Sequence, residues 1–164
     1  MAMIKLTGIN KIYRTNEIET LALENVNLDV AKGEFVSIMG PSGCGKSTLG
    51  RTIIHLLDST DGQIIYKGED ITHVSKKRLQ ELRQSMQIIF QDPYASLNPR
   101  LTVEQTIQEP LKIHNNYSKE KLNEETERLM SLVGIDARLR RSYPHELDGG
   151  RRQRVVIARA LALN

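Results

Sequence analysis

The stretch Gly40-Pro41-Ser42-Gly43-Cys44-Gly45-Lys46-Ser47 decides the fold, because it matches the pattern G-x-x-x-x-G-K-[ST] at every defined position. A short apolar run at residues 35–39 precedes it and is typical of a strand buried on both faces. Residues 46–57 follow, with apolar side chains at helical spacing. A glycine-rich turn between a buried strand and a helix predicts an α/β fold with a phosphate-binding loop. The alternative is a chance turn of the same composition.

The residue types in this loop are those that phosphate binding needs. Glycines let successive backbone N–H groups turn toward one anion, and the start of the following helix adds the positive end of its dipole. We expect Lys46 to reach the β- and γ-phosphates of ATP and the Ser47 hydroxyl to ligate Mg²⁺. Cys44 is either a small filler or a thiol made reactive by the helix N-terminus. The predicted nucleotide-binding residues of the loop are Gly40, Pro41, Ser42, Gly43, Cys44, Gly45, Lys46, Ser47 and Thr48.

Strand and helix patterns surround the loop. Residues 4–12, 26–30 and 63–66 show strand patterns, residues 76–84 a helical pattern, and residues 86–90 a second buried-strand pattern. From Val103 onward the patterns are helical, with Ser118 as a predicted N-cap and Gly134 as a predicted C′ residue. We therefore expect an α/β nucleotide-binding core at residues 1–91, an α-helical subdomain at 92–150 and a last helix at 151–164 returning toward the core.

Composition limits the classes of partner. The 164 residues carry a net charge of +3, and the single cysteine excludes an internal disulfide. We see no signal peptide, and no apolar run approaches the ~18 residues that span a bilayer. Seven arginines near the C-terminal end predict a solvated helical face or, second, a surface for anionic partners. Direct nucleic-acid binding is not expected, because no aromatic residues alternate with them. They are Arg138, Arg140, Arg141, Arg151, Arg152, Arg154 and Arg159.

Three further features make the chain resemble the nucleotide-binding domain of ABC transporters, a P-loop NTPase core with an inserted helical subdomain. Gln91, after residues 86–90, resembles the family's Q-loop glutamine, which implies contact with Mg²⁺ and the attacking water. Tyr13 matches the aromatic residue that stacks on adenine, with a packing role as the alternative. Residues 147–154 resemble the signature motif, which implies contact with the ATP of an opposite subunit. The signature residues concerned are Leu147, Asp148, Gly149, Gly150 and Arg151.

The signature departs from the family's usual L-S-G-G-Q at two positions. Asp148 stands in place of the serine and Arg151 in place of the glutamine. An aspartate should repel a γ-phosphate unless Arg151 compensates. Alternatively, Asp148 caps the helix that begins near Gly150.

The resemblance to subtypes is divided. From about Lys46 onward, and especially at residues 90–100 and 143–147, the chain is similar to the dipeptide, oligopeptide and nickel importers. Residues 21–39 are closer to the lipoprotein-release and macrolide-export type. A natural intermediate and an engineered hybrid both remain open. The resemblance implies ATP and ADP as ligands, a second nucleotide-binding domain and a membrane permease as partners, and a cytoplasmic location at the inner membrane.

The family's later carboxylates have no counterpart that we can assign in the 164 residues. In the family an aspartate holds Mg²⁺ through water, and a glutamate acts as the general base. We therefore expect a truncated domain of weak or absent ATPase activity. His55, His73 and His114 lack motif context and are expected at the surface or in packing. The alternatives are a non-hydrolysing nucleotide-binding fragment and a soluble ABC-type ATPase of DNA repair or translation.

Overall fold

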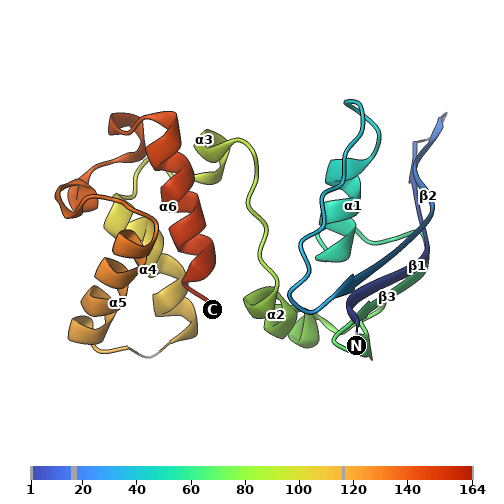
Figure 1. Ribbon diagram of the computed structural model, residues 1–164, viewed down its shortest axis with the longest axis horizontal. Helices are drawn as coiled ribbons and strands as arrows, with labels where there is room; N and C mark the ends of the chain where they lie inside the picture. The colour runs from blue at the N-terminus through green and yellow to red at the C-terminus, as the bar shows by residue number, and fades with distance from the viewer. Residues whose placement is uncertain (1, 16–17, 116, 164) are drawn as a thin grey trace. The chain divides into compact units, whose positions relative to one another are not determined.

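The computed structural model describes residues 2–15, 18–115 and 117–163. The chain forms two compact units, Met1–Arg83 and Gln84–Asn164. Figure 1 shows the order of the elements along the chain. The division into domains at residues 91 and 150 stays a prediction.

The first unit is built on an antiparallel sheet in the order β2-β1-β3-β4. Leu6 lies opposite Leu28 and Ile9 opposite Val26, so the strand patterns near the N-terminus are confirmed. Leu6, Ile9 and Ile64 are almost fully buried on one face of this sheet. The strands are β1 (Ala2–Arg14), β2 (Glu19–Ala31), β3 (Asp61–Tyr66) and β4 (Glu69–Asp70).

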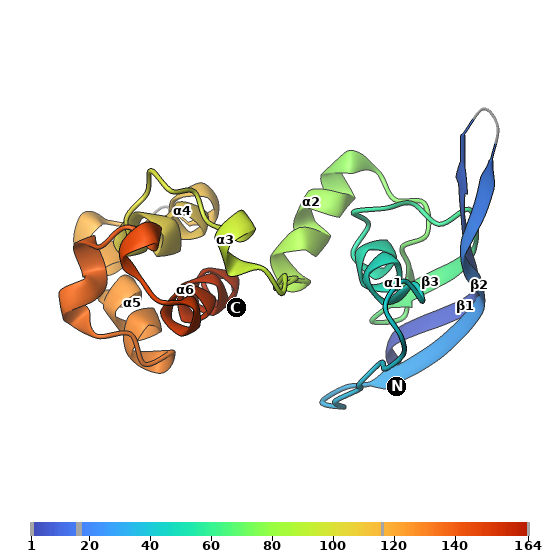
Figure 2. The ribbon, with the colours of Figure 1, turned by 90° about the horizontal axis from the view of Figure 1, so that it is seen from above.

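Helix α1 (Lys46–Ile53) covers the buried face of the sheet, and Figures 1 and 2 both show it beside the strands. Leu49 and Thr52 are the buried residues of this helix. The sequence pattern predicts that this helix reaches residue 57, and that prediction is wrong. It ends at Ile53 because His55 adopts a left-handed conformation with φ of 54°, which an α-helix does not allow. Helix α2 (Lys76–Ser85) confirms the helical pattern at residues 76–84.

Two expected strands, at residues 35–39 and 86–90, are wrong. Both segments lie outside any helix or strand, and residues 35–39 are exposed throughout. Phe35 is 93% exposed and Met39 is 87% exposed, although their pattern predicts burial on both faces. A strand requires a neighbouring backbone to complete its hydrogen bonds. Among the described residues, none of the four strands pairs with residues 35–39, so the run forms no strand.

The second unit is helical. Leu129 and Val155 are at most 1% exposed and belong to a core cluster that includes residues of α4, α5 and α6. Ser118 accepts a hydrogen bond from the Lys121 N–H, and Gly134 has φ of 68°, so the predicted N-cap and C′ residues are confirmed. The elements are α3 (Pro93–Ser96), α4 (Val103–His114), α5 (Lys119–Leu132), the 3₁₀ turns Ala137–Arg141 and Pro144–Glu146, and α6 (Gly149–Leu161).

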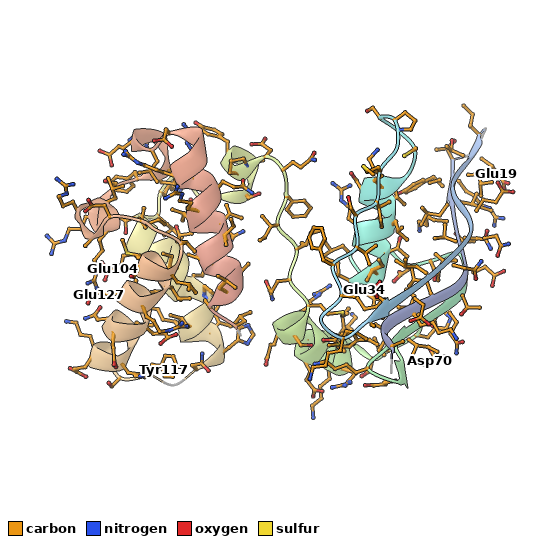
Figure 3. The ribbon with its side chains drawn as sticks, in the orientation of Figure 1. Glu19, Glu34, Asp70, Glu104, Tyr117 and Glu127 are labelled. Atoms are coloured by element: carbon orange, nitrogen blue, oxygen red, sulfur yellow. The ribbon has the colours of Figure 1, made fainter. Side chains whose placement is uncertain are left out.

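One arginine ties α4 to α5. Arg140 donates to Glu104 at 2.5 Å and to Glu127 at 2.6 Å, and Figure 3 shows the two carboxylates near one another. The bond from Arg140 lowers the pKa of Glu104. Both Arg140 and Glu104 are about three-quarters buried, so water screens this pair less than it screens a surface ion pair. Part of the predicted basic face therefore has a structural role.

Candidate functional site

The phosphate-binding pattern forms an irregular loop that leads into α1. Gly43 and Gly45 have φ of 83° and 90°, a region that L side chains rarely adopt. Gly45 is the N-cap of α1 and offers no side-chain cap, so no side chain of the cap residue occupies the first N–H groups of the helix. A Cβ on Gly45 would lie 2.5 Å from the Ala22 carbonyl oxygen. The glycine therefore allows the loop to approach β2 closely.

Lys46 is folded back onto this loop. Its ammonium donates to the carbonyl oxygens of Gly40 and Pro41, each at 2.7 Å, and lies 3.3 Å from the Cys44 sulfur. A Cβ on Gly40 would lie 2.7 Å from the same sulfur. The loop thus gathers a cation and uncapped backbone donors in one place, as a phosphate requires.

Ser47 and Thr48 follow in the first turn of α1. Ser47 is exposed and Thr48 is half-buried. The Thr48 carbonyl accepts a hydrogen bond from the Thr52 hydroxyl at 2.9 Å. A hydroxyl beside a phosphate loop is a suitable oxygen ligand for Mg²⁺, so the donor set fits a magnesium nucleotide. Among the described residues, no cluster of three or more His, Cys, Asp or Glu side chains could hold a metal alone.

Tyr13 lies on β1, in the same unit as the loop, and is 40% exposed. The Lys11 ammonium lies 5.4 Å from the centre of its ring and donates to the Asp58 carbonyl at 2.6 Å. The exposed ring can stack on a base. Its role in binding adenine stays a prediction.

Gln91 belongs to the second unit and is exposed. It directly precedes Asp92, whose side chain caps α3. The loop and Gln91 lie in separate compact units. The ligation of Mg²⁺ by Gln91 stays a prediction.

The signature residues surround the start of α6. The Asp148 side chain accepts a hydrogen bond from the Arg151 N–H at 2.8 Å, and its second oxygen lies 3.3 Å from Arg151 Nε. Asp148 therefore caps the helix, as one of the two interpretations of this residue predicts. Leu147 is only 3% exposed and belongs to the core, whereas Gly149 and Gly150 are exposed.

A hollow of about 320 Å³ opens beside these residues. Asp148, Gly150 and Arg151 line one part of it, and Asp136 and Arg154 line another. Hydrogen bonds from Arg138 lower the pKa of Asp136 to about 2, so this carboxylate is ionised at neutral pH. The hollow combines charges of both signs, and two exposed glycines lie at the helix start next to it.

The contacts of Arg152 and Arg159 with the segment that follows Gln91 were not predicted from the sequence. Arg152 lies over the Tyr94 ring, and Arg159 donates to the Ser96 carbonyl. The two arginines are seven residues apart, a spacing that places both on one face of a helix and could have indicated a shared contact. The partner segment could not be identified from spacing alone.

No helix in the described ranges is long and apolar enough to cross a membrane.

Comparison with known proteins finds a matching family profile and several similar proteins. A family profile described as "ABC transporter" matches residues 23–164. The chain is 49% identical to the oligopeptide transport ATP-binding protein AppF of Bacillus subtilis, over 87% of this chain and 44% of that protein. It is 46% identical to OppF of the same organism, also an oligopeptide transport ATP-binding protein, over 99% of this chain and 54% of OppF. The chain thus spans about half the length of these relatives.

A solved structure shows the same architecture. It is described as a dimeric structure of a post-hydrolysis state of the ATP-binding cassette MJ0796 bound to ADP and Pi. The TM-score is 0.88 at 36% sequence identity, covering 99% of this chain and 70% of that chain. The α/β fold class that the loop predicts is therefore confirmed.

Proposed function

Because this chain belongs to the ABC transporter family, we propose that it binds ATP with Mg²⁺ and acts as part of an ATP-binding subunit that powers membrane transport. The single observation that carries the proposal is the loop before α1. There Lys46, two glycines in the left-handed region and an uncapped helix start are brought together. Each of these features favours a bound polyphosphate.

Lys46 and Ser47 have distinct tasks in this proposal. The Lys46 ammonium leaves the Gly40 and Pro41 carbonyls and binds the β- and γ-phosphates, which offer full negative charge in place of neutral acceptors. The Ser47 hydroxyl would hold Mg²⁺. The resemblance of its segment to the family's Q-loop assigns Gln91 to the same ion. When bound, the metal ion neutralises charge on the phosphates.

The signature residues are assigned to the ATP of a second copy or a homologous domain. Gly149 and Gly150 present backbone N–H groups at the start of α6. The Asp148 carboxylate caps α6 and pairs with the Arg151 side chain. The positive charge of Arg151 therefore offsets the negative charge of Asp148. The dimeric structure of MJ0796 bound to ADP and Pi supports the pairing of two such domains.

A peptide is the favoured substrate class of the whole transporter, with nickel as the alternative from the sequence resemblance. The printed names of AppF and OppF both specify oligopeptide transport, which supports peptide import. Selection of the substrate then belongs to the permease and its partners, and the ATP-binding subunit lies at the cytoplasmic side of the inner membrane.

Turnover by these 164 residues is expected to be slow. We assign no carboxylate in them to the general base, and such a base contributes roughly 10²–10⁴-fold to rate. The proposal therefore separates ATP binding, which the loop supports, from rapid hydrolysis. A chain that binds ATP without turnover is the second candidate.

The test measures MgATP binding and Mg²⁺-dependent phosphate release with the purified chain. Ser47→Ala should reduce the effect of Mg²⁺ on both by about tenfold or more, since it removes a metal ligand. Ser37→Ala, at an exposed serine before the loop, is the matched control. Binding without phosphate release favours the second candidate, and failure to bind MgATP overturns both.

A further inference from the structure

The Lys11 ammonium connects an aromatic ring to the segment that follows α1. It lies 5.4 Å from the centre of the Tyr13 ring, within the range of a cation–π contact. It also donates to the Asp58 carbonyl oxygen at 2.6 Å. Lys11 and Tyr13 are two residues apart on β1, so their side chains leave the strand on the same face. Because the backbone at Asp58 holds the ammonium, the contact restricts the orientation of the ring.

The segment that holds the ammonium is itself attached to β1. The Thr60 N–H donates to the Asn10 carbonyl at 2.8 Å, and the Thr60 hydroxyl accepts a hydrogen bond from the Ile12 N–H at 3.0 Å. These two bonds lie on either side of Lys11 along the strand. The Asp58 carbonyl, two residues before Thr60, is therefore an anchor attached to the same strand that carries the aromatic ring.

The contact also lies near the phosphate-binding loop. Lys11 is opposite Leu23 in the sheet. A Cβ on Gly45, the N-cap of α1, would lie 3.2 Å from Leu23 Cδ2. The loop thus meets β2 at the residue that pairs with Lys11, and Tyr13 follows two residues further along β1, roughly 7 Å away. A nucleotide that extends from the start of α1 along β1 brings its base to this ring.

We propose that Lys11 is a positioning residue that holds the Tyr13 ring in the orientation in which a nucleotide base stacks on it. The ring stays 40% exposed with the ammonium beside it, so surface remains for the base. This inference rests on the proposed function, because it needs a nucleotide whose phosphates occupy the Lys46 loop. Lys11 touches the ring, and its effect on the base is exerted through Tyr13.

The affinity for MgATP relative to that for magnesium tripolyphosphate tests this role, since tripolyphosphate lacks the base. Lys11→Met keeps a long apolar side chain and removes the ammonium. It should lower the affinity ratio about threefold, the effect of an exposed cation–π contact. Lys5→Met is the matched control, because Lys5 also lies on β1 and is exposed. A ratio that falls no further in Lys11→Met than in Lys5→Met overturns the proposal.

Two further variants separate positioning from a general structural role. Lys11→Arg keeps a charged donor that can lie over the ring, so the affinity ratio should stay within about twofold of the wild-type value. Tyr13→Leu removes the ring and should lower the ratio by itself. Addition of Lys11→Met to Tyr13→Leu should lower it no further, because the lysine acts through the ring. A further threefold loss in the double variant overturns the positioning role.

Proton NMR of the full chain without added nucleotide tests the contact itself. The ring current of Tyr13 should shift the Lys11 Cε protons upfield, and Tyr13→Leu should abolish that shift. An unshifted resonance in the wild type overturns the proposal, even where Lys11→Met is too unstable to study. Equal wild-type affinity for MgATP and magnesium tripolyphosphate overturns it as well and leaves the Lys46 loop as a phosphate site. A wild type that binds neither ligand contradicts the proposed function, and the base-positioning role falls with it.

Discussion

The Lys46 ammonium forms its hydrogen bonds within its own loop. Two carbonyl oxygens and a sulfur surround its ammonium. A triphosphate carries full negative charge and attracts this ammonium more strongly than neutral carbonyl oxygens do, so it competes well for this group. The internal bonds keep the cation within the loop until a phosphate arrives.

Modification of Cys44 should block nucleotide binding. The thiol is exposed and lies beside the Lys46 ammonium, so an added group occupies the space of the phosphates. Alkylation is expected to weaken MgATP affinity by at least about tenfold, and bound MgATP should slow the alkylation. Calorimetry on the modified chain measures the effect, with Cys44→Ala treated identically as the control. Normal ATP binding by the alkylated protein would show that this view of the loop is wrong.

Two glycines of the loop should differ in their response to alanine. Gly45→Ala brings a Cβ to 2.5 Å from the Ala22 carbonyl oxygen and also requires φ of 90°. Gly43→Ala requires a similar φ of 83°, but its Cβ meets open space. We expect a loss of stability of about 1–2 kcal/mol for Gly43→Ala from backbone strain, and a larger loss for Gly45→Ala. Urea unfolding followed by circular dichroism measures both, and equal losses would contradict the close approach to β2.

At the level of the elements, local patterns predicted the helices and the N-terminal strands well. The alternation at Val26, Leu28 and Val30, the Ser118 cap and the Gly134 terminus are all local features, and each is confirmed. Residues 35–39 differ because a strand also depends on a partner that no local pattern contains. The chemistry of the loop was equally local, whereas the contacts of Arg152 with Tyr94 depend on tertiary packing.

The end of α1 holds a buried histidine. His55 is 9% exposed, and its Nε2 has no hydrogen-bond partner among the described residues. Burial is the main cause that lowers its pKa, with His73 and Arg83 adding to it and Asp58 and a backbone bond to Ile71 opposing it. The folded protein therefore favours the neutral ring, while the unfolded chain accepts a proton near the ordinary pKa of 6.5.

Acid should weaken the first unit through His55. Because the folded pKa is lowered, the stability contributed by the neutral ring is present above about pH 6.5 and is lost as the pH falls below it. Urea midpoints at pH 7.5, 6.5 and 5.5 test this, with His55→Asn as the variant. Asparagine tolerates φ of 54° but does not titrate, so it should flatten the profile. A variant with the wild-type pH dependence would exclude His55 as the cause.

At the level of the whole molecule, the unpaired apolar segment at residues 35–39 favours association. Phe35 and Met39 are almost fully exposed, and an apolar segment outside any sheet can pair with another chain. We expect self-association without nucleotide, reduced in the double variant Phe35→Ser and Met39→Ser. Sedimentation measures it, and Ile113→Ser, at a 70% exposed position on α4, is the control. A wild-type chain that stays monomeric at high concentration would contradict this expectation.

The central claim is that the loop before α1 holds ATP, and calorimetric titration with MgATP tests it most directly. Lys46→Ala should weaken affinity by about tenfold or more, because it removes a charged donor to the phosphates. Lys76→Ala is the matched control, since Lys76 also opens a helix, α2, and is exposed. The account predicts binding by the wild type and by Lys76→Ala, with a large loss in Lys46→Ala. Unchanged affinity in Lys46→Ala, or no binding by the wild type, would contradict it.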